Sequence, residues 1–224
     1  MPLVGGEPDA YVDLYWLPLG AGGHSVRVNG KVYEAIAARF SHRAPCDLYH
    51  SALQVKSADD TYVIEQGPVL PRSAEDRGIV AVGPVGTRRA GWLALFRYEI
   101  RVWRGGRIPD VAEAVESPLR LTSDGGVAGR LLREVPRVPT PVWGRDELGT
   151  GEMWNSNSVI AWALARSGIE ASSVCPPDGG RAPGWQAGVD VASRDSHAEY
   201  GPPSASMLRF DVAHAANAPN ERYE

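Results

Sequence analysis

The chain's first hundred residues contain several short runs in which the residue type alternates with the period of two that is typical of strands, and tight turns separate these runs. Three of these runs predict strands: residues 11–19 (YVDLYWLPL), 47–55 (DLYHSALQV) and 61–66 (TYVIEQ). Asp59-Asp60 turns the chain between the last two runs, and Asn29-Gly30 separates two more alternating segments as a hairpin turn does. Strands joined by such short turns pair antiparallel, so this half of the chain predicts an antiparallel sheet.

The second half of the chain adds helices to this sheet. Residues 67–90 and 136–151 are expected to be loops, because they are rich in glycine, proline or both. The other expected elements are a strand over 91–103, a short helix after Pro109, a helix capped by Asp124, and a helix within 153–169 that stops at Gly168. The region after Cys175 is dominated by glycine, proline, alanine and serine. Strands and helices do not alternate as in a Rossmann fold, so the predicted class is α+β.

Length and composition predict one globular domain over residues 1–194 and a partly irregular C-terminal extension over 195–224. The net charge of −4 is spread along the chain, which argues against nucleic acid or an anionic membrane as the main partner. No apolar stretch reaches the roughly 20 residues that span a bilayer, and no signal peptide is recognisable, so we expect a cytoplasmic protein. Cys46 and Cys175 have neither metal-site nor disulfide spacing, and no cofactor is expected.

A polar run, Asn155 to Ser158, stands directly before the apolar part of the helix in 153–169. Asn and Ser are preferred helix caps, so the run needs no function beyond capping. Ser156, however, follows the spacing of one helical face together with Val159, Ile160 and Ala163. A serine at the first turn of a buried helical face is also where a nucleophile could meet a base on a strand, beside backbone N–H groups that stabilise an oxyanion.

His50 is the only one of the five histidines that falls inside an expected strand. Side chains alternate along a strand, so His50 shares one face with Leu48 and Ala52, while Tyr49 and Ser51 point to the other. Most lone strand histidines are simply packed or hydrogen-bonded. The two readings of His50, structural residue and catalytic base, stay open at this point.

The pair YHSALQV (49–55) and WNSNSVIAW (154–162) resembles the permuted papain-like hydrolases. These include PPPDE-type peptidases, relatives of lecithin:retinol acyltransferase and the permuted NlpC-type enzymes, in which a strand histidine precedes a nucleophile that opens a helix. His50 and Ser156 stand at the matching positions, but the family's nucleophilic cysteine is a serine here. The resemblance implies a permuted papain-like fold over roughly residues 9–168.

The resemblance implies a hydrolase or acyltransferase that cleaves an amide or ester bond in a small-molecule or peptide substrate. Ser156 would attack with His50 as general base, because a hydroxyl cannot be ionised in advance as a thiol can. Glu65, or less favourably Asp13, would orient the imidazole.

The prediction also includes substrate-binding roles and an alternative function. The expected substrate-binding residues are Asn155, Asn157, Trp154 and Trp185, although the simpler reading of both tryptophans is that they pack, as most tryptophans do. The alternative function is a catalytically inactive papain-like protein that acts as a binding module, because replacing a thiolate nucleophile by serine usually abolishes activity.

Overall fold

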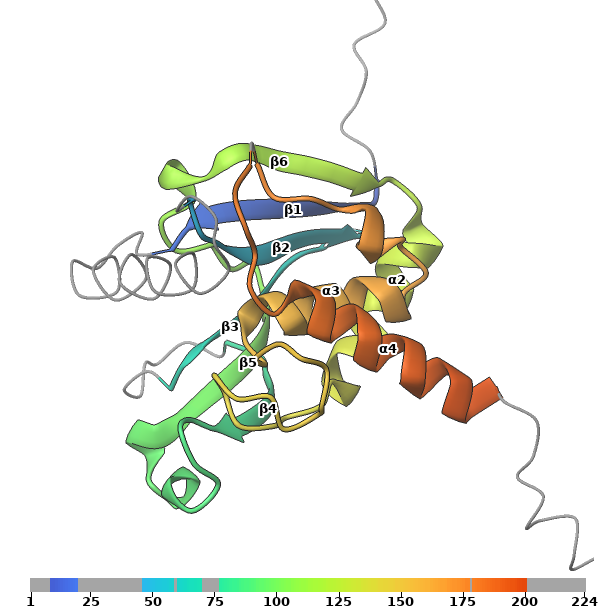
Figure 1. The fold of residues 1–224 in the computed structure, drawn as a ribbon. Helices are drawn as coiled ribbons and strands as arrows, with labels where there is room; N and C mark the ends of the chain where they lie inside the picture. The colour runs from blue at the N-terminus through green and yellow to red at the C-terminus, as the bar shows by residue number, and fades with distance from the viewer. Residues whose placement is uncertain (1–8, 20–45, 59, 70–76, 178, 201–224) are drawn as a thin grey trace, which may run out of the picture. The chain divides into compact units, whose positions relative to one another are not determined.

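Six strands pair into one antiparallel sheet in the order β4-β5-β3-β2-β1-β6 (Figure 1). A computed structural model describes residues 9–19, 46–58, 60–69, 77–177 and 179–200. The strands are β1 (Tyr11–Pro18), β2 (Tyr49–Ser57), β3 (Asp60–Pro68), β4 (Ile79–Pro84), β5 (Arg97–Arg104) and β6 (Val115–Thr122). The helices are α2 (Gly125–Glu134), α3 (Ser156–Arg166) and α4 (Trp185–Tyr200). The α+β class predicted from the sequence is therefore confirmed.

The chain divides into a unit of residues 1–193 and a second, short unit of residues 194–224. All six strands, α2, α3 and the first half of α4 belong to the first unit. Within the described ranges, no helix is both long and apolar enough to cross a bilayer.

The two faces of the sheet have different cores. One face carries Leu14 and Trp16 of β1, Leu53 of β2 and Ile64 of β3, and these pack with α2, α3 and the start of α4. We call it the helix face. The opposite face holds a smaller cluster: Tyr15, Leu17, Ala52, Val63 and Ile108. The alternation of side chains in β1, β2 and β3 thus assigns every residue of these strands to one face or the other.

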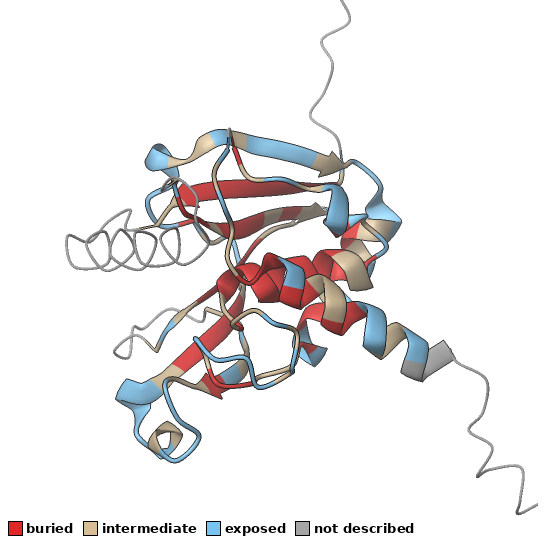
Figure 2. Cartoon of the chain, in the orientation of Figure 1, coloured by how far each residue is buried: buried red, intermediate tan, exposed pale blue. Residues whose placement is uncertain are grey.

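Helix α3 is buried on all sides, as Figure 2 shows by its colour. Every residue from Ser156 to Leu164 is buried, which is typical of a helix enclosed by other elements rather than lying on a surface. On the side away from the sheet, Gly188 of α4 comes so close that an added Cβ would lie 2.2 Å from the Ser158 carbonyl oxygen and 2.9 Å from the Ala161 Cβ. Only glycine fits at this crossing of two helices.

Pairing between β2 and β3 covers only part of both strands. It runs from Ser57 opposite Asp60 to Leu53 opposite Ile64 and then stops. Beyond that point residues 49–52 of β2 pair with β1, and residues 65–68 of β3 pair with β5. The sheet therefore opens between β2 and β3 at one end, and α3 begins over this end because Asn157 binds the Tyr49 carbonyl.

Several elements differ from the sequence prediction. The expected strand 91–103 begins only at Arg97, because residues 90–96 form two 3-10 turns. The expected helix after Pro109 is a single 3-10 turn followed by β6, and the expected loop 67–90 contains the edge strand β4. Helix α4 was not predicted. The hairpin at Asn29-Gly30 lies outside the described residues.

Candidate functional site at the start of α3

The polar run before α3 is first of all a helix cap. Asn155 is the N-cap residue: its side-chain oxygen accepts hydrogen bonds from the backbone N–H groups of Asn157 (2.9 Å) and Ser158 (3.4 Å). The Ser158 hydroxyl in turn accepts from the Asn155 backbone N–H, which completes a capping box. The prediction that this run caps the helix is thus confirmed for Asn155 and Ser158.

Asn157 ties α3 to two other parts of the chain. Its side-chain oxygen accepts from the Ser51 hydroxyl of β2 at 2.9 Å, and its amide donates to the Tyr49 and Pro183 carbonyls at 2.9 and 3.0 Å. Asn155 also donates to Pro183. The side-chain amides of both asparagines, expected to bind substrate, are therefore occupied by contacts that hold the fold together.

Ser156 is the first residue of α3 and is 8% exposed. Its neighbours in the run use their side chains in hydrogen bonds, but the Ser156 hydroxyl forms no hydrogen bond to any residue in the described part of the chain. Ser156 thus remains available to a ligand, in a position next to the first backbone N–H groups of the helix.

His50 and Ser156 are not brought together. Ser51 binds Asn157 on the helix face, and its neighbour His50 points to the opposite face with Ala52. In β1, the residue paired with His50 is Leu17, which belongs to the same opposite cluster. The sheet itself stands between the imidazole and the serine that the sequence predicted as its partner.

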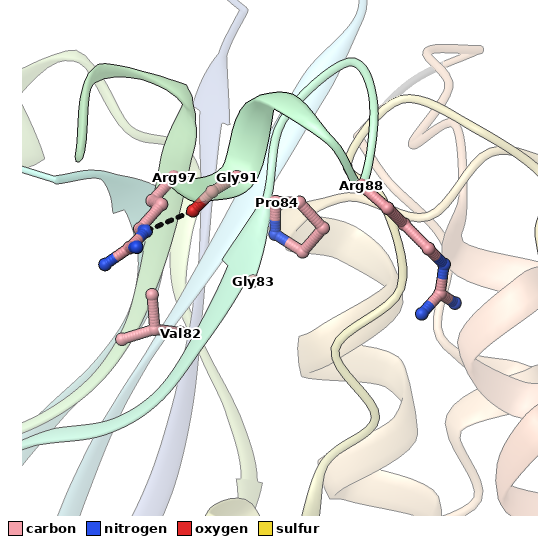
Figure 3. Close-up of a pocket in the computed structure, with 6 residues that line it drawn as sticks. All are labelled: Val82, Gly83, Pro84, Arg88, Gly91 and Arg97. Carbon is pink, nitrogen blue, oxygen red and sulfur yellow. Dashed lines mark hydrogen bonds between the residues drawn. The ribbon is translucent and has the colours of Figure 1, made fainter. Parts of the chain in front are cut away.

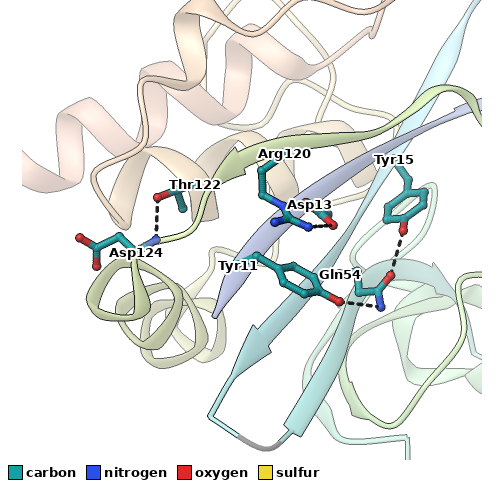
Figure 4. A network of polar contacts seen from close by, with 7 residues as sticks. All are labelled: Tyr11, Asp13, Tyr15, Gln54, Arg120, Thr122 and Asp124. Atoms are coloured by element: carbon teal, nitrogen blue, oxygen red, sulfur yellow. Dashed lines mark hydrogen bonds and ion pairs between the residues drawn. The ribbon is translucent and has the colours of Figure 1, made fainter. Parts of the chain in front are cut away.

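The two carboxylates considered as orienters have other partners. Glu65 accepts from Arg101 at 2.9 Å, in a partly buried ion pair. Asp13 binds the guanidinium of Arg120, which lies 4.2 Å from the ring centroid of Tyr11 (Figure 4). Both acids lie on the face that carries His50, but their charges are balanced by arginine, as is usual for buried carboxylates.

Burial lowers the pKa of the His50 imidazole below its ordinary value of about 6.5, and the nearby Asp110 carboxylate acts in the opposite direction. The folded protein thus holds His50 neutral more firmly than the unfolded chain does. Below about pH 6.5 the unfolded chain binds the proton first, so the free energy of unfolding decreases as the pH falls towards the lowered pKa of the folded state.

We therefore expect His50→Gln to remove part of the acid destabilisation. Urea unfolding measured between about pH 7.5 and pH 5.5 should show a steeper loss of stability for the unchanged protein than for the variant, by at most about 1.4 kcal/mol per pH unit. Parallel pH curves for the two proteins would contradict the assignment.

The two tryptophans expected at a substrate site both belong to the core of the helix face. Trp185 lies 5.1 Å from Trp16 between ring centroids and donates its indole N–H to the Ala171 carbonyl at 2.9 Å. Trp154 is 1% exposed, but its indole N–H has no hydrogen-bond partner. A role in the core thus accounts for the whole Trp185 side chain, but for Trp154 it leaves the indole N–H unexplained.

Gln66 is a functional candidate that the sequence reasoning missed. It is 7% exposed, yet neither its amide nitrogen nor its amide oxygen has a hydrogen-bond partner among the residues that the structure describes. Alternation from Ile64 places Gln66 on the helix face, at the end where β2 and β3 have separated. Buried polar atoms without partners are rare and costly, so each calls for an explanation, and a bound ligand is one such explanation.

Several side chains of the helix face and of the segment that leads into α3 have unused hydrogen-bonding atoms. Trp16 pairs with Ser51 in the sheet register, Ser51 binds Asn157, and the indole N–H of Trp16 has no partner. Trp154 stands two residues before the helix. Together with Gln66 and Ser156, these residues form a group with unused hydrogen-bonding atoms: Trp16, Gln66, Trp154 and Ser156. We call it the α3 polar group.

A signal for Gln66 was present in the sequence. In TYVIEQ, the alternation that puts Tyr62 and Ile64 on one face also puts Gln66 there, as an amide on an apolar face. Its neighbour Glu65 carries the more familiar signal, because a carboxylate can orient a histidine.

The described residues contain no cluster of three or more His, Cys, Asp or Glu side chains able to hold a metal ion. Cys46 and Cys175, which both lie in these ranges, form no disulfide. Comparison with protein-family models, with curated proteins and with solved structures found no match to this chain.

Proposed function

We propose that this protein is a binding module that takes a small polar ligand at the start of α3, and that it does not hydrolyse amides or esters. The observation that carries the proposal is the buried amide of Gln66, which has no hydrogen-bond partner among the described residues and lies on the sheet face that α3 covers. The Ser156 hydroxyl at the start of that helix is also unused. Papain-like ancestry is part of the proposal and rests on the two sequence motifs.

The sheet separates Ser156 from His50, the base predicted for it, and this supports binding over catalysis. A serine hydroxyl needs a general base within hydrogen-bonding distance during attack. His50 lies on the other face of the sheet. The next residue of α3, Asn157, is held by three hydrogen bonds, and its amide cannot accept a proton at neutral pH.

The α3 polar group is rich in donors, which indicates the chemistry of the ligand. Two indole N–H groups can only donate, while Gln66 and Ser156 can both donate and accept. The N-terminus of α3 adds a partial positive charge. A ligand that presents acceptor oxygens, as a carboxylate or an amide does, fits this set.

Gln66→Leu separates function from stability. Leucine has a similar volume and leaves no unpaired polar atoms, so we expect the variant to be more stable than the unchanged protein by about 1 kcal/mol. Urea unfolding measures this difference. A loss of stability would show that the amide has a partner in the folded protein and would count against the site.

The binding test uses the indole N–H resonances in ¹H–¹⁵N spectra during titration with acetate and with acetamide. We expect the signals of Trp16 and Trp154, assigned through Trp→Phe variants, to shift with one of these probes. The signal of Trp185 is the internal control, because its N–H already binds Ala171. The shifts should disappear in Gln66→Leu.

Hydrolysis is tested separately with a serine-directed fluorophosphonate. We expect no labelling of Ser156 at any pH between about 6 and 9, the range in which a histidine base would act. Labelling that is lost in Ser156→Ala would overturn the binding proposal in favour of a serine hydrolase. Unchanged indole signals with both probes would overturn it as well.

A further inference from the structure

Exposed apolar side chains gather in one short segment between β4 and β5. Residues 92–96 are all exposed, and Trp92 and Leu95 are 75% and 86% exposed. Four of the eight large exposed hydrophobic residues in the described ranges belong to it: Trp92, Leu93, Leu95 and Phe96. Single exposed apolar residues are ordinary, but a contiguous apolar patch of this kind marks a surface that binds something.

The segment is a formed structure rather than an open loop. Its two 3-10 turns, Ala90–Trp92 and Ala94–Phe96, are closed at their base by a hydrogen bond from the Val85 backbone N–H to the Phe96 carbonyl (2.8 Å). The Arg97 side chain donates to the Gly91 carbonyl (Figure 3) and to the Trp92 carbonyl (3.0 Å). The side chains at the tip are thus held outwards while backbone carbonyls behind them are satisfied, as an apolar environment requires.

Positive charge surrounds the apolar tip. Arg88, Arg89 and Arg97 flank it, and no acidic residue lies between Gly86 and Arg97. Arg88 is paired with Glu147 at 2.9 Å, but Arg89 is exposed and Arg97 binds only backbone carbonyls, so both keep their charge. The chain's net charge of −4 conceals this local excess of arginine.

A hollow of about 420 Å³ lies beside the turns and is lined by two of these arginines (Figure 3). Arg88 and Arg97 line it together with Val82 and Pro84 of β4. Guanidinium groups bind phosphate oxygens well. Glu147 already binds Arg88, so Arg97 is the arginine of this hollow whose charge can meet a phosphate next to the apolar tip.

We propose that the segment Trp92–Phe96 inserts into the interface of an anionic lipid bilayer. Tryptophan favours the level of the lipid headgroups, leucine and phenylalanine favour the acyl boundary below, and arginines beside them meet the phosphates. This inference is independent of the function proposed for the α3 polar group.

Charge favours a lipid surface over a second copy of the chain. A two-fold contact through this tip would bring the Arg89 and Arg97 side chains of both copies towards one another without acidic partners. A projecting segment of five residues is also far smaller than the 20–30 residues a side of a stable protein interface.

The test is sedimentation with vesicles of phosphatidylcholine, with and without phosphatidylglycerol. We expect the full chain to bind the mixed vesicles, and to bind them more weakly at high salt, because screening weakens the arginine contacts. Trp92→Ser combined with Leu95→Ser should reduce binding at least about tenfold, since it removes the two most exposed apolar side chains. Leu119→Ser is the matched control: Leu119 is 40% exposed on β6, outside the segment.

Acyl-chain-brominated phosphatidylcholine in the vesicles locates the contact. We expect it to quench part of the tryptophan emission, and to quench less in Trp92→Phe, which keeps an aromatic side chain at the tip. Failure to bind mixed vesicles would overturn the proposal, and so would equal loss of binding in Leu119→Ser. Self-association that the double serine variant abolishes, without vesicle binding, would identify a second copy as the occupant instead.

Discussion

Asn157→Ala is expected to lower the free energy of unfolding by about 2–4 kcal/mol. The substitution removes the hydrogen bonds of Asn157 with the Ser51 hydroxyl and the Tyr49 carbonyl, and a buried polar group that loses its hydrogen bond costs about 1–3 kcal/mol. It also removes one of the bonds that hold Pro183 to α3. Urea unfolding followed by circular dichroism measures the change.

Ser156→Ala is the control for this prediction, because it is the adjacent residue, similarly buried, and its hydroxyl binds no described residue. We expect a change of less than about 0.5 kcal/mol. Equal effects of the two alanine substitutions would contradict the view that Asn157, rather than the polar run as a whole, joins α3 to the sheet.

Gly188→Ala is expected to destabilise the protein by about 3 kcal/mol, although alanine is the better helix former. The new Cβ would lie 2.2 Å from the Ser158 carbonyl oxygen, so α3 and α4 would have to move apart. The atoms that this Cβ would meet, the Ser158 carbonyl oxygen and the Ala161 Cβ, are not at the end of a flexible side chain and cannot swing away. Thermal and urea unfolding both report the loss.

Gly129→Ala in α2 is the matched helical control. An added Cβ there comes no closer than 3.4 Å to the end of the flexible Arg133 side chain. Alanine then acts only through its lower loss of backbone entropy on folding, and it should stabilise the helix by about 0.5–1 kcal/mol. Opposite signs at the two glycines would show that close helix packing, and not helix propensity, decides the outcome at residue 188.

Elements with strong local signals could be predicted from the sequence. Strands β1, β2 and β3 follow their alternation, Asp124 caps α2 through the Val127 N–H, and α3 ends before Gly168, which has a positive φ of 91°. Each of these signals is contained in a few neighbouring residues, so no knowledge of tertiary contacts is needed.

Helix α4 and strand β6 could not be predicted in this way. The glycine inside α4 weakens its helical pattern, and it is there because α3 packs against it. Strand β6 contains a proline, and Glu116 has a positive φ of 46°, so the local pattern resembles a turn. In both cases a contact distant in sequence overrides the local preference.

In the candidate site, the local features could be predicted from the sequence, but the placement of α3 on the sheet could not. Alternation correctly separated His50 from Tyr49 and Ser51, and the cap at Asn155 could be recognised from its residue types. Which face of the sheet lies under α3 is a tertiary property that alternation cannot supply. That choice puts Ser51, rather than His50, beside the helix.

The hydrogen bonds around α3 also bear on the order in which the chain can fold. They join Tyr49 and Ser51 to Asn157, more than one hundred positions later, and Asn157 to Pro183 beyond it. Contacts of such high sequence separation require large loops to close first, which slows folding. During synthesis, the start of α3 therefore cannot acquire all its partners until residue 183 has left the ribosome, long after the first strands of the sheet have emerged.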